Sequence, residues 1–393
     1  MSEDESVVDA LFINSGILGQ RTFAEFVRGA FDTDVDGVRV TQTLVTEDLT
    51  PGERVMRYAL CLPLWPPGAA GIKNLDFHRY RCELNAGLLA RNRLRRLERA
   101  GRRFDVLHFH RQPTAYASLD AMRRIPSIVS IDGTQRCVLQ HARTTIETRS
   151  YGPNIRRDGE IFRAARLIIS VSEWAARSVR EEYPGCDAET AVMPNPVGLP
   201  PASDGWIAER HARAREDGAL PRVLFVGGDF PRKGGFDLLD VWAHARLHER
   251  ARLDIMSNWP LDVSTLPPGV TQHKDVFTGT DAWHALWRAA DLFVLPTRDE
   301  AFGIVYQEAG AAGLPAIGTR MNAVPEIVRP GETGMLVMPG DKSDLARAMQ
   351  LLIASPDMRR EMGTRGRAFI AASADPERYR RTLAAAIRRV AGR

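Results

Sequence analysis

Two adjacent cations, Arg232 and Lys233, stand in a glycine-rich turn where they could bind phosphate groups. The stretch RVLFVGGDFPRKGGFDLLDVW, residues 222–242, has a short apolar run, a turn and then apolar residues at helical spacing, which predicts a strand, a turn and a helix. In open α/β sheets ligands bind at the carboxyl ends of the strands, and the start of a helix favours anions. A diphosphate would fit beside these cations, although an ordinary surface pair in a loop is an alternative.

Two carboxylates, Glu300 and Glu308, flank a second predicted turn from a strand into a helix. The backbone N–H groups of Phe302, Gly303 and Ile304, at the expected start of that helix, could bind a phosphate. Carboxylates are good acceptors for paired sugar hydroxyls. The alternatives are a solvated loop acid at Glu300 and a surface helix residue at Glu308. The run AGAAG that follows Glu308 suits close packing and favours burial of this carboxyl.

Strands and helices that alternate along the chain must position these residues. In the first half, short β-type runs occur at Val7–Ile13, Val38–Val45, Val106–Phe109, Ser127–Ile131, Leu167–Val171 and Ala191–Met193. In the second half they occur at Arg222–Val226, Leu253–Met256, Val270–His273, Leu292–Leu295, Ala316–Gly318 and Met335–Val337. Helical stretches lie between the runs, so the pattern predicts two doubly wound α/β domains with parallel sheets.

The expected domain boundary lies in a stretch where this rhythm stops. Residues 194–221 are rich in proline, glycine and charge, and we interpret them as a linker and not as a core element. The sequence therefore predicts one domain over 1–198 and a second over 199–374, a division that a length of 393 residues allows. The last segment, 375–393, has the apolar face of a helix that could pack on either domain.

Composition excludes some classes of protein. The chain is 44% hydrophobic and 26% charged, with a formal net charge of only +4, so nothing indicates general binding to nucleic acid. The four cysteines lie far apart without zinc spacing, and we expect reduced thiols and no metal. A basic start with an apolar core, as in a signal peptide, is absent, and so is an apolar run of membrane-spanning length. A cytoplasmic location is therefore expected.

The carboxyl-terminal half closely resembles the retaining glycosyltransferases of family 4, which have the GT-B fold. The resemblance rests on GGDFPRKGG at 227–235, on the two glutamates eight residues apart, and on AGLPAIGTRMNAVPEIVRPGETGMLVMPGD at 312–341. It implies two Rossmann-like domains facing a central cleft. It also implies that Arg232 and Lys233 bind the donor diphosphate and that Glu308 binds the ribose. Glu300 and the backbone at 302–304 would then meet the donor sugar and phosphates.

The amino-terminal half resembles the family more loosely. Gly16 and Gly19 follow the first predicted strand and are similar to the family's glycine loop near the donor phosphate, although an ordinary tight turn is an alternative. Asp132 ends another strand at the position where many relatives have histidine. Asp132 or His110 could orient an acceptor hydroxyl there, with turn formation by Asp132 as the alternative. His108 we interpret as a strand-end residue with a backbone partner.

The resemblance implies chemistry without a metal or a cofactor other than the nucleotide-sugar donor. Arg232, Lys233 and a helix N-terminus would stabilise the charge that develops on the leaving diphosphate. A front-face displacement is implied, in which the departing phosphate takes the proton of the acceptor hydroxyl. The acceptor is unknown. A nucleotide-sugar epimerase or hydrolase on the same fold, or a binding protein without turnover, are the competing functions.

Two further signals are weaker. The Asp-x-Asp pattern over Asp32–Asp36 is typical of metal sites in the other large glycosyltransferase fold, but it stands in a short polar segment that we interpret as a solvated turn. The arginine-rich run Arg91–Arg103 could contact an anionic membrane or a lipid-linked acceptor. A solvated helix with leucines facing the core is the alternative for this run.

Overall fold

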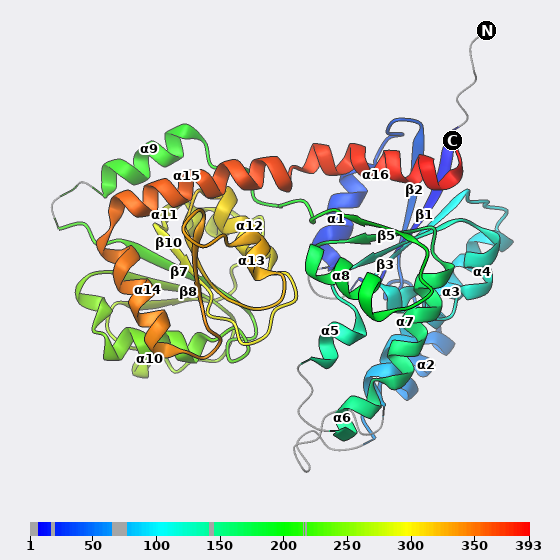
Figure 1. The fold of residues 1–393 in the computed structure, drawn as a ribbon, viewed down its shortest axis with the longest axis horizontal. Coiled ribbons are helices and arrows are strands. Elements are labelled where there is room, and N and C mark those ends of the chain that lie inside the picture. The colour runs from blue at the N-terminus through cyan, green and yellow to red at the C-terminus, as the bar shows by residue number, and fades with distance from the viewer. Residues whose placement is uncertain (1–6, 17–19, 65–76, 141–144, 215, 217) are drawn as a thin grey trace, which may run out of the picture. The chain divides into compact units, whose positions relative to one another are not determined.

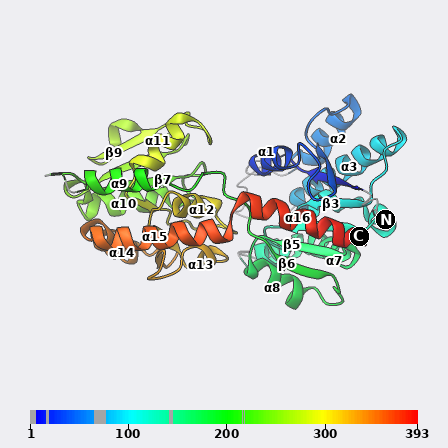
Figure 2. The same cartoon turned by 90° about the horizontal axis from the view of Figure 1, so that it is seen from above.

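The protein consists of two compact units. The computed structural model describes residues 7–16, 20–64, 77–140, 145–214, 216 and 218–393. Unit 1 comprises Met1–Asn195 together with Glu377–Arg393, and unit 2 comprises Pro196–Pro376. Each unit has its own sheet and helices (Figures 1 and 2).

Unit 1 is built on a sheet of six parallel strands in the order β2-β1-β3-β4-β5-β6. Their bounds are β1 Val8–Asn14, β2 Val38–Leu44, β3 Val106–His110, β4 Ser127–Ile131, β5 Leu167–Ser170 and β6 Glu189–Val192. The order reverses between β1 and β3, because β2 lies on one side of β1 and all later strands lie on the other. Such a reversal is the point where open α/β sheets bind ligands, at the carboxyl ends of the strands.

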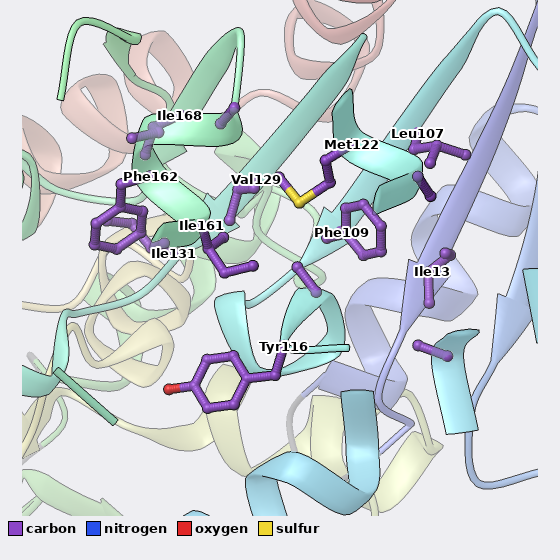
Figure 3. Close-up of a cluster of buried hydrophobic side chains, with 14 of the residues drawn as sticks. Ile13, Leu107, Phe109, Tyr116, Met122, Val129, Ile131, Ile161, Phe162 and Ile168 are labelled. Atoms are coloured by element: carbon purple, nitrogen blue, oxygen red, sulfur yellow. The ribbon is translucent and has the colours of Figure 1, made fainter. Parts of the chain in front are cut away.

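Helices cover both faces of this sheet. They are α1 Gln20–Ala30, α2 Pro51–Cys61, α3 His78–Arg99, the 3-10 helix η2 Gln112–Ala115, α4 Leu119–Arg124, α5 Gln135–Leu139, α6 Thr145–Ser150, α7 Gly152–Ala164, α8 Glu173–Glu182 and α16 Pro376–Ala391. One buried cluster contains Phe109, Val129 and Phe162 (Figure 3). The cluster on the opposite face contains Phe12 and Leu383. Since successive side chains of a strand alternate between faces, both layers are filled from the same strands.

Unit 2 has a second sheet of six parallel strands, in the order β12-β11-β10-β7-β8-β9. Their bounds are β7 Arg222–Val226, β8 Arg252–Met256, β9 Val270–His273, β10 Leu292–Val294, β11 Ala316–Thr319 and β12 Gly334–Val337. Here the order reverses between β7 and β10. The loops that follow these two strands are the ones that carry the predicted phosphate-binding and carboxylate residues.

Helices also surround the second sheet. They are α9 Asp204–Arg213, α10 Gly235–His244, η3 Leu247–Glu249, η4 Val263–Thr265, α11 Asp281–Ala289, α12 Ile304–Ala311, α13 Val324–Ile327, α14 Lys342–Ala354 and α15 Pro356–Ser373. Trp242 on α10 and Trp283 and Trp287 on α11 are fully buried. Large apolar side chains of this kind supply most of the burial that holds a helix on a sheet.

Each predicted strand is present, with ends that differ by two residues at most. The prediction that 194–221 contains no core element is wrong, because α9 lies within it. Ser203 caps this helix by accepting from the N–H of Trp206, and Arg210 is buried with Nη1 3.0 Å from the Gly313 carbonyl. Arg210 contributes a long apolar stem to the core, which a count of apolar residues does not register.

The carboxyl-terminal helix α16 packs on unit 1. Leu383 and Ile387 are fully buried in the same cluster as Phe12 of β1. The sequence predicted that this helix could pack on either domain. An apolar face indicates that a helix is covered, but it does not indicate which sheet covers it.

Candidate functional site

The loops after β7 and β10 lie against each other in unit 2. The strands are neighbours, with Phe293 paired to Leu224, so their carboxyl ends open at the same edge of the sheet. The N–H of Arg298 donates to the carbonyl of Arg232 at 2.8 Å. Gly234 has φ +74°, and a Cβ there would stand 1.9 Å from the carbonyl oxygen of Pro296. Only glycine permits this close approach, which fixes one loop on the other.

Lys233 and Glu300 form an ion pair across these two loops. Both side chains are largely buried, with exposed fractions of 15% and 13%. Burial of either charge alone would be unfavourable, and the ion pair lets each compensate the other. The structure thus brings together a predicted phosphate-binding cation and a predicted sugar-binding acid.

Arg232 lies beside this pair but is more open to solvent. Its Nε is 3.0 Å from Oδ2 of Asp229, and its Nη1 donates to the carbonyl of Asp299 at 2.7 Å. The side chain is 40% exposed. The guanidinium is therefore tethered to both loops and keeps surface available to a further acceptor.

Helix α12 begins at this edge with its N-terminal N–H groups uncapped by a side chain. Gly303 is the N-cap residue, with φ +88°, and a Cβ there would stand 2.6 Å from the ring of Tyr306. Phe302 is buried, and Ile304 is the first residue of the helix. The predicted backbone site at 302–304 therefore coincides with a helix start that remains open to an anion.

Glu308 lies one turn further along α12 and is half-buried. Burial raises the pKa of this carboxyl to about 8. Within the part of the chain that the structure describes, its side chain forms no hydrogen bond or ion pair. The carboxyl is thus partly withdrawn from solvent, and the expected polar partner is not supplied by the described residues.

The corresponding edge of unit 1 lies where β1, β3 and β4 end. Gly16 follows β1 with φ +72°, its N–H donates to Oδ1 of Asn14 at 2.9 Å, and a Cβ there would stand 2.5 Å from Oγ1 of Thr46. Gly16 thus has a conformation and a close approach that favour glycine. Gly19, which we expected in the same glycine loop, lies outside the described residues.

The two histidines of β3 are buried. His110 stacks on Phe23, with ring centroids 4.4 Å apart and an interplanar angle of 9°, and burial lowers its pKa to about 4. His108 has Nε2 2.7 Å from Oγ of Ser130. The expected backbone partner of His108 is therefore a hydroxyl group instead. The stacked and buried ring of His110 favours a packing role.

Asp132 follows β4 and pairs with Arg111, which follows β3. Arg111 Nε lies 3.3 Å from Oδ1 of Asp132, and their side chains are 32% and 41% exposed. Among the described residues, no backbone N–H donates to the Asp132 carboxylate, so the turn-capping alternative is not observed. Sequence reasoning did not single out Arg111, although a cation placed directly after a predicted strand was a usable signal.

A buried polar network supports the backbone beside Asp132. Gln112 Nε2 donates to the carbonyl of Gly133 at 2.9 Å, and the N–H of Gln135 donates to Oδ2 of Asp158 at 3.0 Å. Tyr116 donates to Oδ1 of Asp158 at 2.8 Å. Burial raises the pKa of Asp158 to about 7. These contacts fix the backbone of the segment that follows β4. The sequence pattern does not reveal such buried polar partners.

The weaker signals lie away from both edges. Asp34 lies in the turn between α1 and β2 and pairs with Arg39 of β2, and the exposed aspartates of this segment confirm the expected solvated turn. The described residues contain no group of three or more histidine, cysteine or acidic side chains that could hold a metal ion. In the run Arg91–Arg103, Arg96 pairs with the buried Glu53 at 3.0 Å. Among the helices that the structure describes, none has the length and apolar character to cross a bilayer.

Two family models match the chain. The model described as Glycosyltransferase Family 4 matches residues 63–199, and the model described as Glycosyl transferases group 1 matches residues 207–369. The second range contains both loops of the unit 2 edge.

Curated relatives are similar over part of their length. An MMP alpha-(1->4)-mannosyltransferase from Mycolicibacterium hassiacum is 25% identical over 57% of this chain and 54% of that protein. A D-inositol 3-phosphate glycosyltransferase from Streptomyces bingchenggensis is 28% identical over 66% of this chain and 61% of that protein. The chain thus spans little more than half the length of these relatives.

Solved structures are similar over almost the whole chain. A sucrose-phosphate synthase from Thermosynechococcus elongatus has a TM-score of 0.69 at 18% identity, covering 98% of this chain and 99% of that one. HepE from Anabaena in complex with UDP-glucose has a TM-score of 0.64 at 16% identity, covering 96% and 99%. At such identities the likeness shows the fold. Together with the two family models, it shows that the chain belongs to glycosyltransferase family 4 and has the GT-B fold of two Rossmann-like domains.

Proposed function

We propose that the protein is a retaining glycosyltransferase, which moves a sugar from a nucleotide-diphosphate-sugar donor to an acceptor hydroxyl without a metal. The observation that carries the proposal is the buried Lys233–Glu300 pair at the β7/β10 reversal, next to Arg232 and the open start of α12. A cation, an acid and free N–H groups at one edge match the diphosphate and the sugar of such a donor.

The chemistry follows from the leaving group. When the bond between sugar and phosphate breaks, negative charge develops on the diphosphate, and the sugar gains positive character. In the proposed complex Lys233 leaves Glu300 and binds the diphosphate together with Arg232 and the N–H groups at 302–304. Glu300 is then free to accept hydrogen bonds from hydroxyls of the donor sugar. The acceptor oxygen attacks the sugar carbon from the face that the phosphate leaves, so the configuration at that carbon is retained. The departing phosphate takes the proton of the acceptor hydroxyl.

Glu308 is proposed to bind the ribose of the nucleotide. Its carboxyl group has a pKa raised to about 8 by burial, so it is mostly protonated at neutral pH in the free protein. Two ribose hydroxyls donating to the carboxylate would favour its charged form. Nucleotide binding should therefore release a proton from Glu308. UDP is the first nucleotide to test, since HepE was solved with UDP-glucose.

Asp132 is proposed to act on the acceptor side, where its carboxylate would accept a hydrogen bond from a sugar or acceptor hydroxyl. It stands at the carboxyl end of β4, close to the strand reversal of unit 1, and its side chain is 41% exposed. Gly16 would support the donor phosphate from the turn after β1. His110 is a weaker candidate, because its ring is buried against Phe23.

A peripheral membrane contact through Arg91–Arg103, within a cytoplasmic location, is a secondary proposal. Arg96 is engaged by Glu53, but Arg95 and Arg99 are exposed on α3 and remain available for anionic headgroups. Sedimentation with vesicles of anionic and of neutral lipid would test this, with Arg95→Gln/Arg99→Gln expected to lose binding to the anionic vesicles. Equal binding of the double variant would refute it.

The function itself is tested by incubating the protein with UDP-, GDP-, ADP- and TDP-sugars, with and without a panel of acceptors. A transferase releases nucleotide diphosphate faster when its acceptor is present. Release independent of every acceptor would indicate a hydrolase, and a new sugar on the intact nucleotide would indicate an epimerase. Binding without any conversion would indicate a protein that holds nucleotide sugars without turnover.

A further inference from the structure

Two of the cysteines stand together where helices α2 and α3 of unit 1 pack on each other. Cys61 is the last residue of α2, and Cys82 lies in the second turn of α3. Both thiols are free, and both residues are partly exposed to solvent. The thiol of Cys82 interacts with that of Cys61. Two neighbouring thiols that a small oxidant can reach are the starting point for a disulfide.

Polar contacts from the first turn of α3 hold the end of α2, and with it Cys61. Arg81 donates from Nη1 to the carbonyl of Leu60 at 3.0 Å and from Nη2 to the carbonyl of Leu62 at 2.9 Å. His78 Nε2 lies 2.9 Å from the carbonyl of Cys61. Three successive carbonyls at the end of α2 thus have partners just before the second cysteine of the pair. The fold itself therefore holds the two thiols beside each other.

The two thiols of this pair differ in how readily they react. Burial, together with the contact to Cys61, raises the pKa of Cys82 to about 12, although the nearby charge of Arg81 opposes this shift. Since the thiolate is the reactive form, Cys61 is the member of the pair that attacks an oxidant first. The carbonyl of Cys61 can only accept, so Nε2 of His78 carries a hydrogen. This N–H lies 3.5 Å from Sγ of Cys82 and can stabilise the charge that develops there in a second step.

The other two cysteines have ordinary packing roles. Cys137 is buried, and its sulfur accepts from Oγ1 of Thr134 at 3.4 Å. Cys186 is partly exposed, and its thiol donates to the carbonyl of Phe162 at 3.5 Å. Within the described part of the chain, neither contacts another cysteine. Cys186 therefore shares the partial exposure of the α2–α3 pair but lacks a facing thiol, which makes it the matched comparison.

We propose that Cys61 and Cys82 are a site of reversible oxidation, at which a peroxide converts the two thiols into a disulfide between the end of α2 and α3. The proposal goes beyond the transferase function and does not depend on it, because it concerns two helices of unit 1 alone. The bond needs the two sulfur atoms about 2.05 Å apart, so the side chains must turn from their present contact into bonding geometry.

Atoms and electrons balance with hydrogen peroxide as the oxidant. The Cys61 thiolate attacks one peroxide oxygen, the O–O bond breaks, and the hydroxide that leaves takes the proton lost by Cys61 to form water. Cys61 is then a sulfenic acid. The Cys82 sulfur attacks the Cys61 sulfur, the S–O bond breaks, and the second hydroxide leaves with the Cys82 proton as water. The two thiols lose two electrons, and a dithiol reductant reverses the reaction by thiol–disulfide exchange.

The disulfide would form beside the buried polar network of unit 1. Glu83 directly follows Cys82, and its carboxylate accepts from Nε2 of Gln135 at 3.0 Å. The N–H of Gln135 donates in turn to Asp158. A covalent link from α2 therefore restrains the helix that contributes Glu83 to this network. Since a cross-link restricts the unfolded chain, the oxidised protein should also resist thermal unfolding better than the reduced one.

The test starts from the full chain in its fully reduced form, which is treated with hydrogen peroxide and then alkylated to block the remaining thiols. Mass spectrometry of peptides prepared without reductant shows which cysteines are thiols, oxidised acids or disulfides. The unmodified protein is compared with Cys61→Ser, Cys82→Ser and the control Cys186→Ser. Thermal unfolding of each protein is measured before and after oxidation.

We expect the unmodified protein to lose two of its four thiols and to give one cross-linked peptide pair, Cys61 with Cys82, which dithiothreitol separates again. Cys61 should be oxidised about tenfold or more faster than Cys186. Oxidation should raise the melting temperature of the unmodified protein by about 5 °C. Cys186→Ser should behave in the same way, whereas Cys61→Ser and Cys82→Ser should show neither the cross-linked peptides nor the rise.

Three results would overturn the proposal. Both cysteines of the pair could remain thiols under conditions that oxidise Cys186, or Cys61 could end as a sulfinic acid without a bond to Cys82. A disulfide between two copies of the chain, seen as a dimer on a non-reducing gel in place of the internal bond, would also contradict it. Because the peptide map is made on the unmodified protein, it decides the matter without relying on the folding of the serine variants.

Discussion

The two strand reversals of the molecule carry the same kind of side-chain pair in different settings. At β7/β10 of unit 2, Lys233 and Glu300 are paired and only 15% and 13% exposed. Beside the β1/β3 reversal of unit 1, Arg111 after β3 and Asp132 after β4 are paired, and they are 32% and 41% exposed. In each pair a cation and a carboxylate compensate each other's charge.

The difference between the two pairs lies in what organises them. In unit 2, burial and the close contact of Gly234 with the other loop set the geometry of the pair. A ligand that separates Lys233 from Glu300 must therefore supply new partners for both buried charges. In unit 1, the pair is more exposed and joins the ends of the neighbouring strands β3 and β4. We infer that the unit 2 edge is adapted to one invariant group, the diphosphate, and that the unit 1 edge is open enough to suit a particular acceptor.

Removal of the unit 2 cation should have the largest effect. We expect Lys233→Ala to lower turnover by about 100- to 1,000-fold, since it loses a charge-assisted contact to a group that gains charge in the transition state. Arg232→Ala should act in the same direction. Nucleotide release at saturating donor measures both. Near-normal rates in the two variants would show that the diphosphate is not bound at this edge.

Removal of the unit 1 charge should have a smaller effect. Asp132→Asn keeps the size of the side chain but loses the charged acceptor, and we expect transfer to fall by about tenfold or more. The melting temperature and the nucleotide affinity should not change, because the pair with Arg111 is partly exposed. Asp120→Asn, an exposed acid on α4, is the control. Unchanged transfer in Asp132→Asn would assign this carboxylate no part in the reaction.

The two glutamates of unit 2 should separate nucleotide binding from sugar binding. Glu308→Gln should weaken binding of the free nucleotide diphosphate by about five- to tenfold, because an amide oxygen accepts less well than a carboxylate from two hydroxyls. Glu300→Gln should spare that affinity and reduce turnover. Titration calorimetry on both variants decides the matter, and equal losses of affinity would refute this division of roles.

The smallest expected effect concerns pH. The raised pKa of Glu308, about 8 against 4.5 for a free carboxyl, means that the folded protein keeps a proton that the unfolded chain loses. This residue therefore lowers stability progressively as pH rises from about 4.5 to about 8. Glu308→Gln should remove that contribution. The melting temperature of the variant, relative to that of the unmodified protein, should therefore increase as pH rises. A constant difference between the two proteins across this range would contradict the account.

The strands and the unit 2 edge could be predicted from the sequence because both have local signals. Apolar runs between helical segments placed every strand. Arg232, Lys233 and Glu300 stand in turns, and Glu308 follows Glu300 at a distinctive spacing of eight residues. The helix α9 was missed because a hydropathy pattern counts Arg210 as polar, although this residue is buried and its apolar stem packs in the core. The Arg111–Asp132 pair joins residues that follow two different strands, and such tertiary contacts leave no periodic signal.

We infer that the β7/β10 edge of unit 2 holds the nucleotide of the donor. Lys274 provides a matched comparison, because it is an exposed lysine that follows β9, at the outer end of the same sheet. The most direct measurement is titration of UDP, GDP, ADP and TDP into the unmodified protein, Lys233→Ala and Lys274→Ala. The account predicts that at least one nucleotide binds, that Lys274→Ala binds it equally well, and that Lys233→Ala binds it about tenfold or more weakly. Equal affinity in the two lysine variants would contradict it.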